Sequence, residues 1–325
     1  MQGIQQYGDE IHEALFVDKN KNKNEVIFNI ATSTNLSQRI TISQYYQAAY
    51  EHTLYDDLKS KLSGDYGYII SLMFLSPLEF CVKMLKKAVP KDESCIFEML
   101  TSKSVEELKL IESSYYNETK KNLQEELGKG FSGTLKKNIL NLFTTQRTYN
   151  SAPNKNECET NANTLIEIGE SNWVNDENVF REIFLKKSPE ELILIARYYK
   201  KKTKNNLLDV IDKKLSGKNK TLLREVLYNN ILPHELFAEK VNKSIKGLGT
   251  DEELLSRVLV SRSELDMAAI RSMYVFKYKN TLKDDVIDDT SGFYQKIFVF
   301  PLLLSPVCSR IPPSHTIILI QTRFS

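Results

Sequence analysis

The chain has 325 residues, 41% of them hydrophobic and 26% charged, a composition ordinary for a globular protein with a sizeable core. Lys and Arg number 44 against 42 Asp and Glu, and this near balance argues against a dedicated nucleic-acid-binding protein, which usually has a strong basic excess. The first ten residues lack a basic region followed by an apolar core, so we expect no signal peptide.

A fourfold repeat organises the sequence. Ser-Gly pairs, separated by 69, 84 and 75 residues, stand at residues 63–64, 132–133, 216–217 and 291–292. The same offsets align three columns of hydrophobic residues, which chance would rarely supply. The columns are Ile42, Ile111, Ile195 and Ile270; Tyr46, Tyr115, Tyr199 and Tyr274; and Leu54, Leu123, Leu207 and Leu282.

Each copy has the hydrophobic pattern of α-helices. Leu108, Ile111 and Tyr115 follow the i, i+3, i+7 spacing of a buried helix face. Capping boxes or close approximations to them indicate where such helices begin: Asn35 with Gln38, Ser104 with Glu107, Ser188 with Glu191, and Ser263 with Asp266. No segment shows the sustained alternation of a β-strand, so the sequence predicts an all-α fold.

The offsets divide the chain into four repeats, a linker and a tail. The extra residues of the longest offset form a polar segment with Pro153, which we interpret as a linker between two halves. The apolar stretch 297–320 is broken by four prolines and contains Arg310, so it lacks the pattern of a transmembrane helix. The predicted segments are repeat one, 8–80; repeat two, 81–143; the linker, 144–163; repeat three, 164–233; repeat four, 234–300; and an atypical tail, 301–325.

Repeat four contains a glycine-rich loop, "KGLGT", at residues 246–250. A helix is expected before it, and Gly247 and Gly249 then let the chain turn sharply while its carbonyl groups stay exposed. Thr250 is predicted to cap the next helix, with Glu253 completing a capping box.

This loop and a later acid have the spacing of a calcium site. Asp289 lies forty residues after Gly249. The carbonyl groups of Ile245, Gly247 and Gly249 and a bidentate carboxylate would supply about five of the six to eight oxygens that calcium takes, and an external phosphate oxygen would fit an open position. A phosphate-binding loop is disfavoured, because its motif is absent and three acids follow the glycines. The alternative without a metal is a helix end with a flexible joint and Asp289 as a surface acid.

Several motifs together make the chain resemble an annexin. They are "KGLGT" (246–250), "VSRSELD" (260–266), "IRSMY" (270–274), "DDTSG" (288–292) and "GESNWVND" (169–176), the last similar to the start of a third annexin repeat. The resemblance covers roughly residues 8–300. It implies four repeats of about five helices each in a slightly curved disc, with calcium loops on the convex face.

The resemblance also implies a ligand set and a location. Ile245, Gly247, Gly249 and Asp289 would bind Ca2+, and Thr250 with Glu252 would form a secondary site. The bound calcium would bridge to acidic phospholipids. The protein would be cytoplasmic and peripheral on the cytosolic face of membranes.

The first three repeats depart from the annexin pattern. At the two glycine positions and the acid position they carry Lys19, Lys21 and Lys61; Ala88, Pro90 and Gly130; and Asn172, Val174 and Lys214. None of these sets matches the expected calcium site. One hypothesis is that fixed lysines replace the bound cation and contact lipid headgroups: Lys19, Lys21, Lys61 and Lys214. The alternative is drift, in which lost sites became solvated loops.

Two functions remain open on the sequence alone. One is a calcium-dependent phospholipid-binding peripheral membrane protein. The other is a cytoskeleton-associated or scaffold protein that keeps the annexin fold and binds largely without calcium, as an analogy with the giardins suggests. The cysteines are far apart and form no C-x-x-C pair, as expected for reduced thiols: Cys81, Cys95, Cys158 and Cys308. The histidines form no metal-ligand or triad pattern, so we expect no enzyme: His12, His52, His234 and His315.

Overall fold

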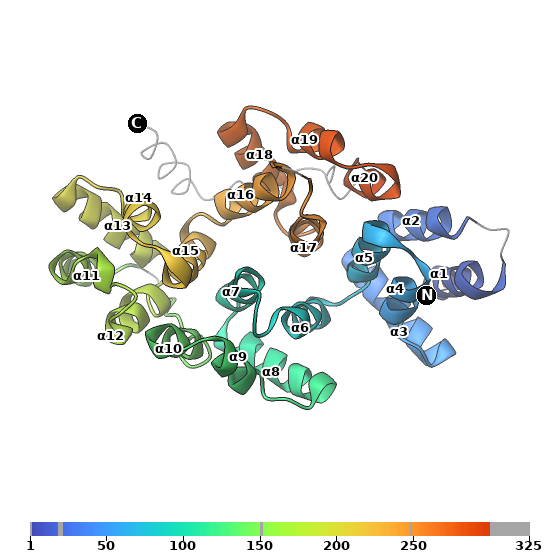
Figure 1. Cartoon of the computed structure of the whole chain (residues 1–325), viewed down its shortest axis with the longest axis horizontal. Helices are drawn as coiled ribbons and strands as arrows, with labels where there is room; N and C mark the ends of the chain where they lie inside the picture. The colour runs from blue at the N-terminus through green and yellow to red at the C-terminus, as the bar shows by residue number, and fades with distance from the viewer. Residues whose placement is uncertain (1, 19–21, 150–151, 248, 300–325) are drawn as a thin grey trace. The chain divides into compact units, whose positions relative to one another are not determined.

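The computed structural model describes residues 2–18, 22–149, 152–247 and 249–299. Within these ranges the chain consists of α-helices with short π-helical and 3₁₀ turns and no β-strand, which confirms the all-α prediction (Figure 1). The predicted tail at 301–325, Cys308, and the lipid-contact candidates Lys19 and Lys21 lie outside the described residues.

The described helices form two compact units. The described part of the first combines residues up to 80 with residues 234–299, and the described part of the second lies within residues 81–233. The early fragment of unit one contains α1 (Gln2–His12), the π-helical turn η1 (Glu13–Val17), α2 (Lys23–Ser33), α3 (Leu36–Tyr50), α4 (Leu54–Lys61) and α5 (Gly64–Met73). The late fragment contains α16 (Pro233–Ile245), α17 (Glu252–Arg262), α18 (Met267–Tyr278), α19 (Leu282–Asp289) and α20 (Gly292–Val299).

Unit one has one hydrophobic core to which both fragments contribute. α5 packs against α17, and α2 packs against α20, so helices of the first and fourth repeats lie side by side (Figure 1). Ile30 and Ile70 from the early fragment belong to the same buried cluster as Leu255 and Ile297 from the late fragment. Repeat one therefore buries its apolar faces partly against repeat four.

Unit two contains the remaining helices. α11 packs along α13, and α7 packs against α15. The elements are α6 (Pro77–Ala88), which begins before the unit boundary, α7 (Glu93–Thr101), α8 (Val105–Thr119), α9 (Leu123–Gly130), α10 (Gly133–Asn141), α11 (Lys155–Ile168), η2 (Glu170–Asn172), α12 (Glu177–Val179), η3 (Phe180–Leu185), α13 (Pro189–Thr203), α14 (Leu207–Lys214) and α15 (Gly217–Ile231). Since α11 begins at Lys155, residues 155–163 of the polar stretch that we interpreted as a linker are helical.

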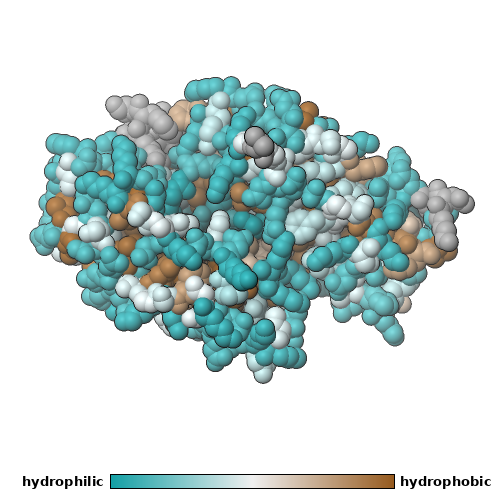
Figure 2. Space-filling view, viewed as in Figure 1, coloured by the Kyte–Doolittle hydropathy of each residue, from teal (hydrophilic) through white to brown (hydrophobic). Residues whose placement is uncertain are grey.

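The predicted hydrophobic columns lie in the cores. All twelve Ile, Tyr and Leu side chains are buried, and none is more than 4% exposed. The face of the molecule seen in Figure 2 is correspondingly mostly hydrophilic, with small and separate hydrophobic areas. The sequence columns therefore mark inward-facing positions of equivalent helices.

The repeat extends to backbone conformation. The residues after α3, α8, α13 and α18 are left-handed, with φ between 59° and 64°, although none is glycine: Glu51, Lys120, Lys204 and Lys279. A left-handed residue that ends a helix is usually glycine. These four positions are spaced by the same offsets as the Ser-Gly pairs, so each copy ends its third helix in the same way.

Three of the four predicted capping boxes are present, at the starts of α3, α8 and α13. The fourth, Ser263 with Asp266, is wrong. α17 continues to Arg262, and Ser263 is its C-cap. The Asp266 carboxylate accepts a hydrogen bond from Arg262 Nε at 2.8 Å, and this charged donor competes well with a neutral backbone N–H group.

Candidate metal centre

The glycine-rich loop of repeat four connects α16 to α17. Gly247 and Gly249 have φ values of 142° and 88°, which side-chain-bearing residues rarely adopt. A Cβ atom at either position would have no neighbour within 4 Å, so the backbone conformation and not close packing requires glycine. The backbone N–H of Asp251 donates to the Ser244 carbonyl at 2.7 Å and closes the base of the loop.

Asp289, the predicted carboxylate ligand, lies beside this loop at the end of α19. The Thr250 hydroxyl is 2.6 Å from the Asp289 carboxylate Oδ2 and 2.9 Å from the Asp289 carbonyl oxygen. This contact joins two segments that are 39 residues apart in the sequence. The structure thus brings together the loop and the acid that the spacing singled out.

The prediction that Thr250 caps α17 is wrong. Asp251 is the N-cap, and its side chain accepts a hydrogen bond from the N–H of Leu254 at 2.9 Å. Glu253 consequently does not occupy the third helical position that a capping box requires. The Thr250 hydroxyl is directed to Asp289 instead, a charged acceptor that forms the stronger bond.

A second acid, Asp285, binds the lysine of the loop. The Lys246 ammonium group lies 3.2 Å from its Oδ1, and Tyr274 donates to its Oδ2 at 2.6 Å. Burial opposes ionisation of Asp285, but hydrogen bonds from Tyr274, Asn280 and Lys246 lower its pKa below the ordinary value. The positive charge of Lys246 is therefore paired with Asp285.

The donor set suits a hard cation. Across residues 2–299, apart from the gaps in the description, no three His, Cys, Asp or Glu side chains converge to hold a metal. The predicted site needs only one carboxylate and takes its other oxygens from backbone carbonyl groups, which is a calcium-type and not a zinc-type set. The open glycine loop and the positioned Asp289 fit such an ion.

Four segments of the chain match a sequence model described as Annexin: residues 17–71, 80–142, 159–226 and 236–300. The chain belongs to the annexin family. Annexins generally bind phospholipids in a calcium-dependent manner. Within the described ranges of this annexin, every helix is too short or too polar to span a bilayer.

Known proteins agree with this assignment. Annexin A3 of Mus musculus is 32% identical over 278 residues, which is 85% of this chain and 86% of that protein. The structure of annexin III has a TM-score of 0.83 at 29% identity and covers 92% of this chain and 94% of that one. The calcium-bound structure of alpha-14 giardin has a TM-score of 0.74 at 17% identity and covers 93% and 99%, a likeness that shows the fold alone.

In repeat two of this annexin, the first loop carbonyl group is already hydrogen-bonded, and the backbone occupies the space beside the acid position. The Ala88 carbonyl accepts hydrogen bonds from the N–H groups of Lys91 and Asp92, both at 2.8 Å. A Cβ atom at Gly130, the acid position, would lie 2.3 Å from the Pro90 carbonyl oxygen. An acid therefore has no room at residue 130 unless the loop moves.

The loop of repeat three is closed by one hydrogen bond from repeat two and one from within the loop. The buried Asn138 side chain donates to the Val174 carbonyl at 2.8 Å, and Asn172 donates to the Ile168 carbonyl at 2.6 Å. Lys214, at the acid position, forms an ion pair with Glu170 at 2.7 Å. The Lys214 candidate for lipid contact thus has an acidic partner within its own repeat.

Repeat one has a third arrangement, seen in the residues next to the undescribed positions 19–21. The Lys61 ammonium group lies 4.6 Å from the centroid of the Phe16 ring. Lys23 donates to the Lys61 carbonyl at 2.6 Å. Lys23 thus makes to the Lys61 carbonyl the contact that the Thr250 hydroxyl makes to the Asp289 carbonyl, and an ammonium group replaces the carboxylate at the acid position.

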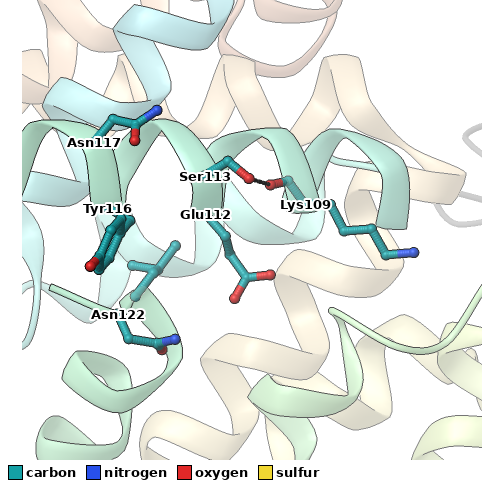
Figure 3. A pocket seen from close by; sticks show the side chains of 7 residues that line it. Lys109, Glu112, Ser113, Tyr116, Asn117 and Asn122 are labelled. Atoms are coloured by element: carbon teal, nitrogen blue, oxygen red, sulfur yellow. Dashed lines mark hydrogen bonds between the residues drawn. The ribbon is translucent and has the colours of Figure 1, made fainter. Parts of the chain in front are cut away.

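A pocket of about 480 Å³ lies elsewhere, along α8 and the start of α9 (Figure 3). Glu112 accepts a hydrogen bond from Gln124 at 2.7 Å, and the Ser113 hydroxyl donates to the Lys109 carbonyl at 3.0 Å. The lining residues are Lys109, Glu112, Ser113, Tyr116, Asn117, Asn122 and Leu123. None of them belongs to a predicted site, and we assign no ligand to this pocket.

Proposed function

We propose that this annexin is a peripheral membrane protein whose fourth repeat binds anionic phospholipid through calcium on the cytosolic face. Ile245, Gly247 and Gly249 would contribute carbonyl oxygens, and Asp289 would contribute its carboxylate. Bound calcium supplies a double positive charge with open coordination positions that lipid phosphate oxygens can fill. A weaker secondary site would use Thr250 and Glu252, the residues at the start of α17.

The hydrogen bond between Thr250 and Asp289 is the observation that carries this proposal. A carboxylate held by a neighbouring hydroxyl group has fewer orientations to lose when it binds an ion. The 2.6 Å contact places this carboxylate beside a loop whose two glycines have positive φ values. Repeats two and three, in contrast, use loop carbonyl groups for internal hydrogen bonds.

Co-sedimentation with phosphatidylserine vesicles tests the proposal. We expect wild-type protein to pellet in calcium, and Asp289→Ala to lose the calcium-dependent fraction. Asp288→Ala removes an adjacent exposed carboxylate and is the matched control, which should pellet like wild type. Equal pelleting of Asp289→Ala and Asp288→Ala in calcium would refute the assignment of the ligand.

Thr250→Val tests the positioning role of the hydroxyl group. The substitution keeps the shape of the side chain and removes the donor to Asp289. A hydrogen bond to a charged group contributes about 1.5–3 kcal/mol, so we expect calcium affinity to fall at least about tenfold. Calorimetric calcium titration, with thermal unfolding as a check on the fold, measures this effect.

A scaffold function is the second candidate. Three repeats lack the calcium ligands, and two of them close their loops internally, which favours a protein that has largely lost calcium control. Its partner would be a cytoskeletal protein, bound equally well in calcium and in chelator. In either case we infer a binding function and not catalysis, in keeping with the family.

A further inference from the structure

Repeat one exposes two hydrophobic side chains next to its former calcium position. Phe16 is 43% exposed and Val17 is 64% exposed. The repeat offsets place Val17 at the position of Ile245, which is 4% exposed in repeat four. The difference has a local cause: α16 ends regularly at Ile245, whereas α1 passes into the π-helical turn η1, which ends at Val17.

Two lysines lie close to this exposed pair, on a turn that also carries the acids Glu13 and Asp18. Lys61 stands over the Phe16 ring, and Lys23 binds the carbonyl group of Lys61, the last residue of α4. A ring attracts an ammonium group without neutralising its charge. In Figure 2 a small hydrophobic area is visible at the right-hand edge, where Figure 1 places α1 and the turn after it.

In two other repeats, lysines at the positions of Lys61 and Val17 are bound by acids. Lys214 pairs with Glu170 in repeat three. In repeat two Lys86 occupies the position of Val17, and it pairs with Glu118 at 2.8 Å. Repeat one combines its lysines with exposed apolar side chains instead, and this combination matches the chemistry of an anionic bilayer surface.

We propose that Phe16, Val17, Lys23 and Lys61 form a calcium-independent contact with anionic lipid. The two apolar side chains would enter the boundary between headgroups and acyl chains, and the ammonium groups would pair with lipid phosphates. The inference rests on the proposed membrane-binding function, but it does not use the calcium site of repeat four. Repeat one would hold the protein near the membrane, and calcium in repeat four would strengthen that contact.

Vesicle co-sedimentation in chelator tests the inference with a matched pair of variants. Phe16→Ser with Val17→Ser removes the proposed apolar contact. Leu265→Ser with Phe276→Ser is the control, because Leu265 is 66% exposed and Phe276 is 43% exposed beneath Lys279, and neither belongs to the proposed contact. We expect the first variant to bind phosphatidylserine vesicles about tenfold more weakly, a change of about 1.4 kcal/mol, and the control to bind like wild type.

A fluorescent residue gives an independent readout. Trp173 is the single tryptophan of the chain and is fully buried, so its emission should not respond to lipid. In chelator, the tryptophan emission of a Val17→Trp variant should shift to shorter wavelength on vesicles and should be quenched by brominated phosphatidylserine. A Leu265→Trp variant should show neither change.

The outcomes separate this inference from the proposed function. Wild-type binding in chelator that only the Phe16 and Val17 variant loses supports the inference. Binding that strictly requires calcium, or an equal effect of the two double variants, overturns the inference and leaves the calcium proposal intact. Absence of binding with and without calcium overturns both.

Discussion

Repeats three and four place opposite charges at the same helix end. α19 ends at Asp289, whose carboxylate is held by a hydroxyl group, whereas α14 ends at Lys214, whose ammonium group binds Glu170. The hydrogen bond from Lys214 is the main reason why the pKa of Glu170 lies below its ordinary value. Repeat three thus supplies a cation from its own chain at the position where we propose that repeat four binds a calcium ion.

The strongest way to break this contrast is to give repeat four the charge of repeat three. Asp289→Lys should abolish calcium binding, since it removes the carboxylate ligand and adds a repelling charge; we expect affinity to fall more than about a hundredfold, or about 2.7 kcal/mol. Calorimetric titration measures the calcium affinity of each variant. Asp288→Lys makes the same charge change at an exposed neighbour, and an equal loss there would show that the effect is not local.

Removing the hydrogen bond that Asn138 of repeat two donates to the loop of repeat three should destabilise the protein. Asn138→Ala leaves the buried Val174 carbonyl without its hydrogen bond, and an unpaired buried group costs about 1–3 kcal/mol. Chemical denaturation measures the change. Asn141→Ala on the same helix, whose side chain is only partly buried, should cost less than about 0.5 kcal/mol.

Reversing the charge at residue 214 tests whether an acid alone is enough to give repeat three a calcium site like that proposed for repeat four. Lys214→Asp restores an acid at the ligand position but places it beside Glu170, and the Val174 carbonyl remains bound by Asn138. We expect no additional calcium site and a loss of stability of about 1 kcal/mol or less, because the pair is partly exposed. Calcium stoichiometry and unfolding of Lys214→Asp and Lys213→Asp should be compared; a gain of one bound calcium would contradict this account.

The smallest expected effect concerns a feature that both repeats share. Lys204 has a φ value of 64°, a conformation that disfavours side-chain-bearing residues. Lys204→Gly should therefore stabilise the protein by about 0.5–1 kcal/mol, after allowing for the greater flexibility of glycine in the unfolded chain. The corresponding change at the helical residue Lys200 should destabilise it, and thermal unfolding distinguishes the two.

The repeat architecture could be predicted because it depends on periodic burial. Ile42, Tyr46 and Leu54 and their equivalents are inward-facing in every copy, and a fixed offset exposes such a pattern in the sequence. The Gly247 and Gly249 loop with Asp289 was also recognisable from spacing. The structure brings these segments together through Thr250, whose contact with Asp289 the sequence did not indicate.

The remaining features depend on contacts between segments that are distant in the sequence. The pattern Ser-x-x-Asp favoured a cap at Ser263, but it gives no sign that Arg262 holds Asp266. The exposure of Val17 depends on a π-helical turn that hydrophobic periodicity does not reveal. Glu170 could have been found as the partner of Lys214, because the offsets place it at the ligand position of Ile245.

The composition of unit one has a consequence for synthesis. The early fragment of unit one leaves the ribosome before unit two, but its core is completed only by helices that begin at Pro233 or later. While residues 81–233 are being made, α2 and α5 lack α20 and α17, the helices against which they pack in the finished protein. The described helices of unit two are all synthesised earlier, so the middle of the chain should fold before repeat one. Repeat one is therefore the part for which chaperone protection matters most.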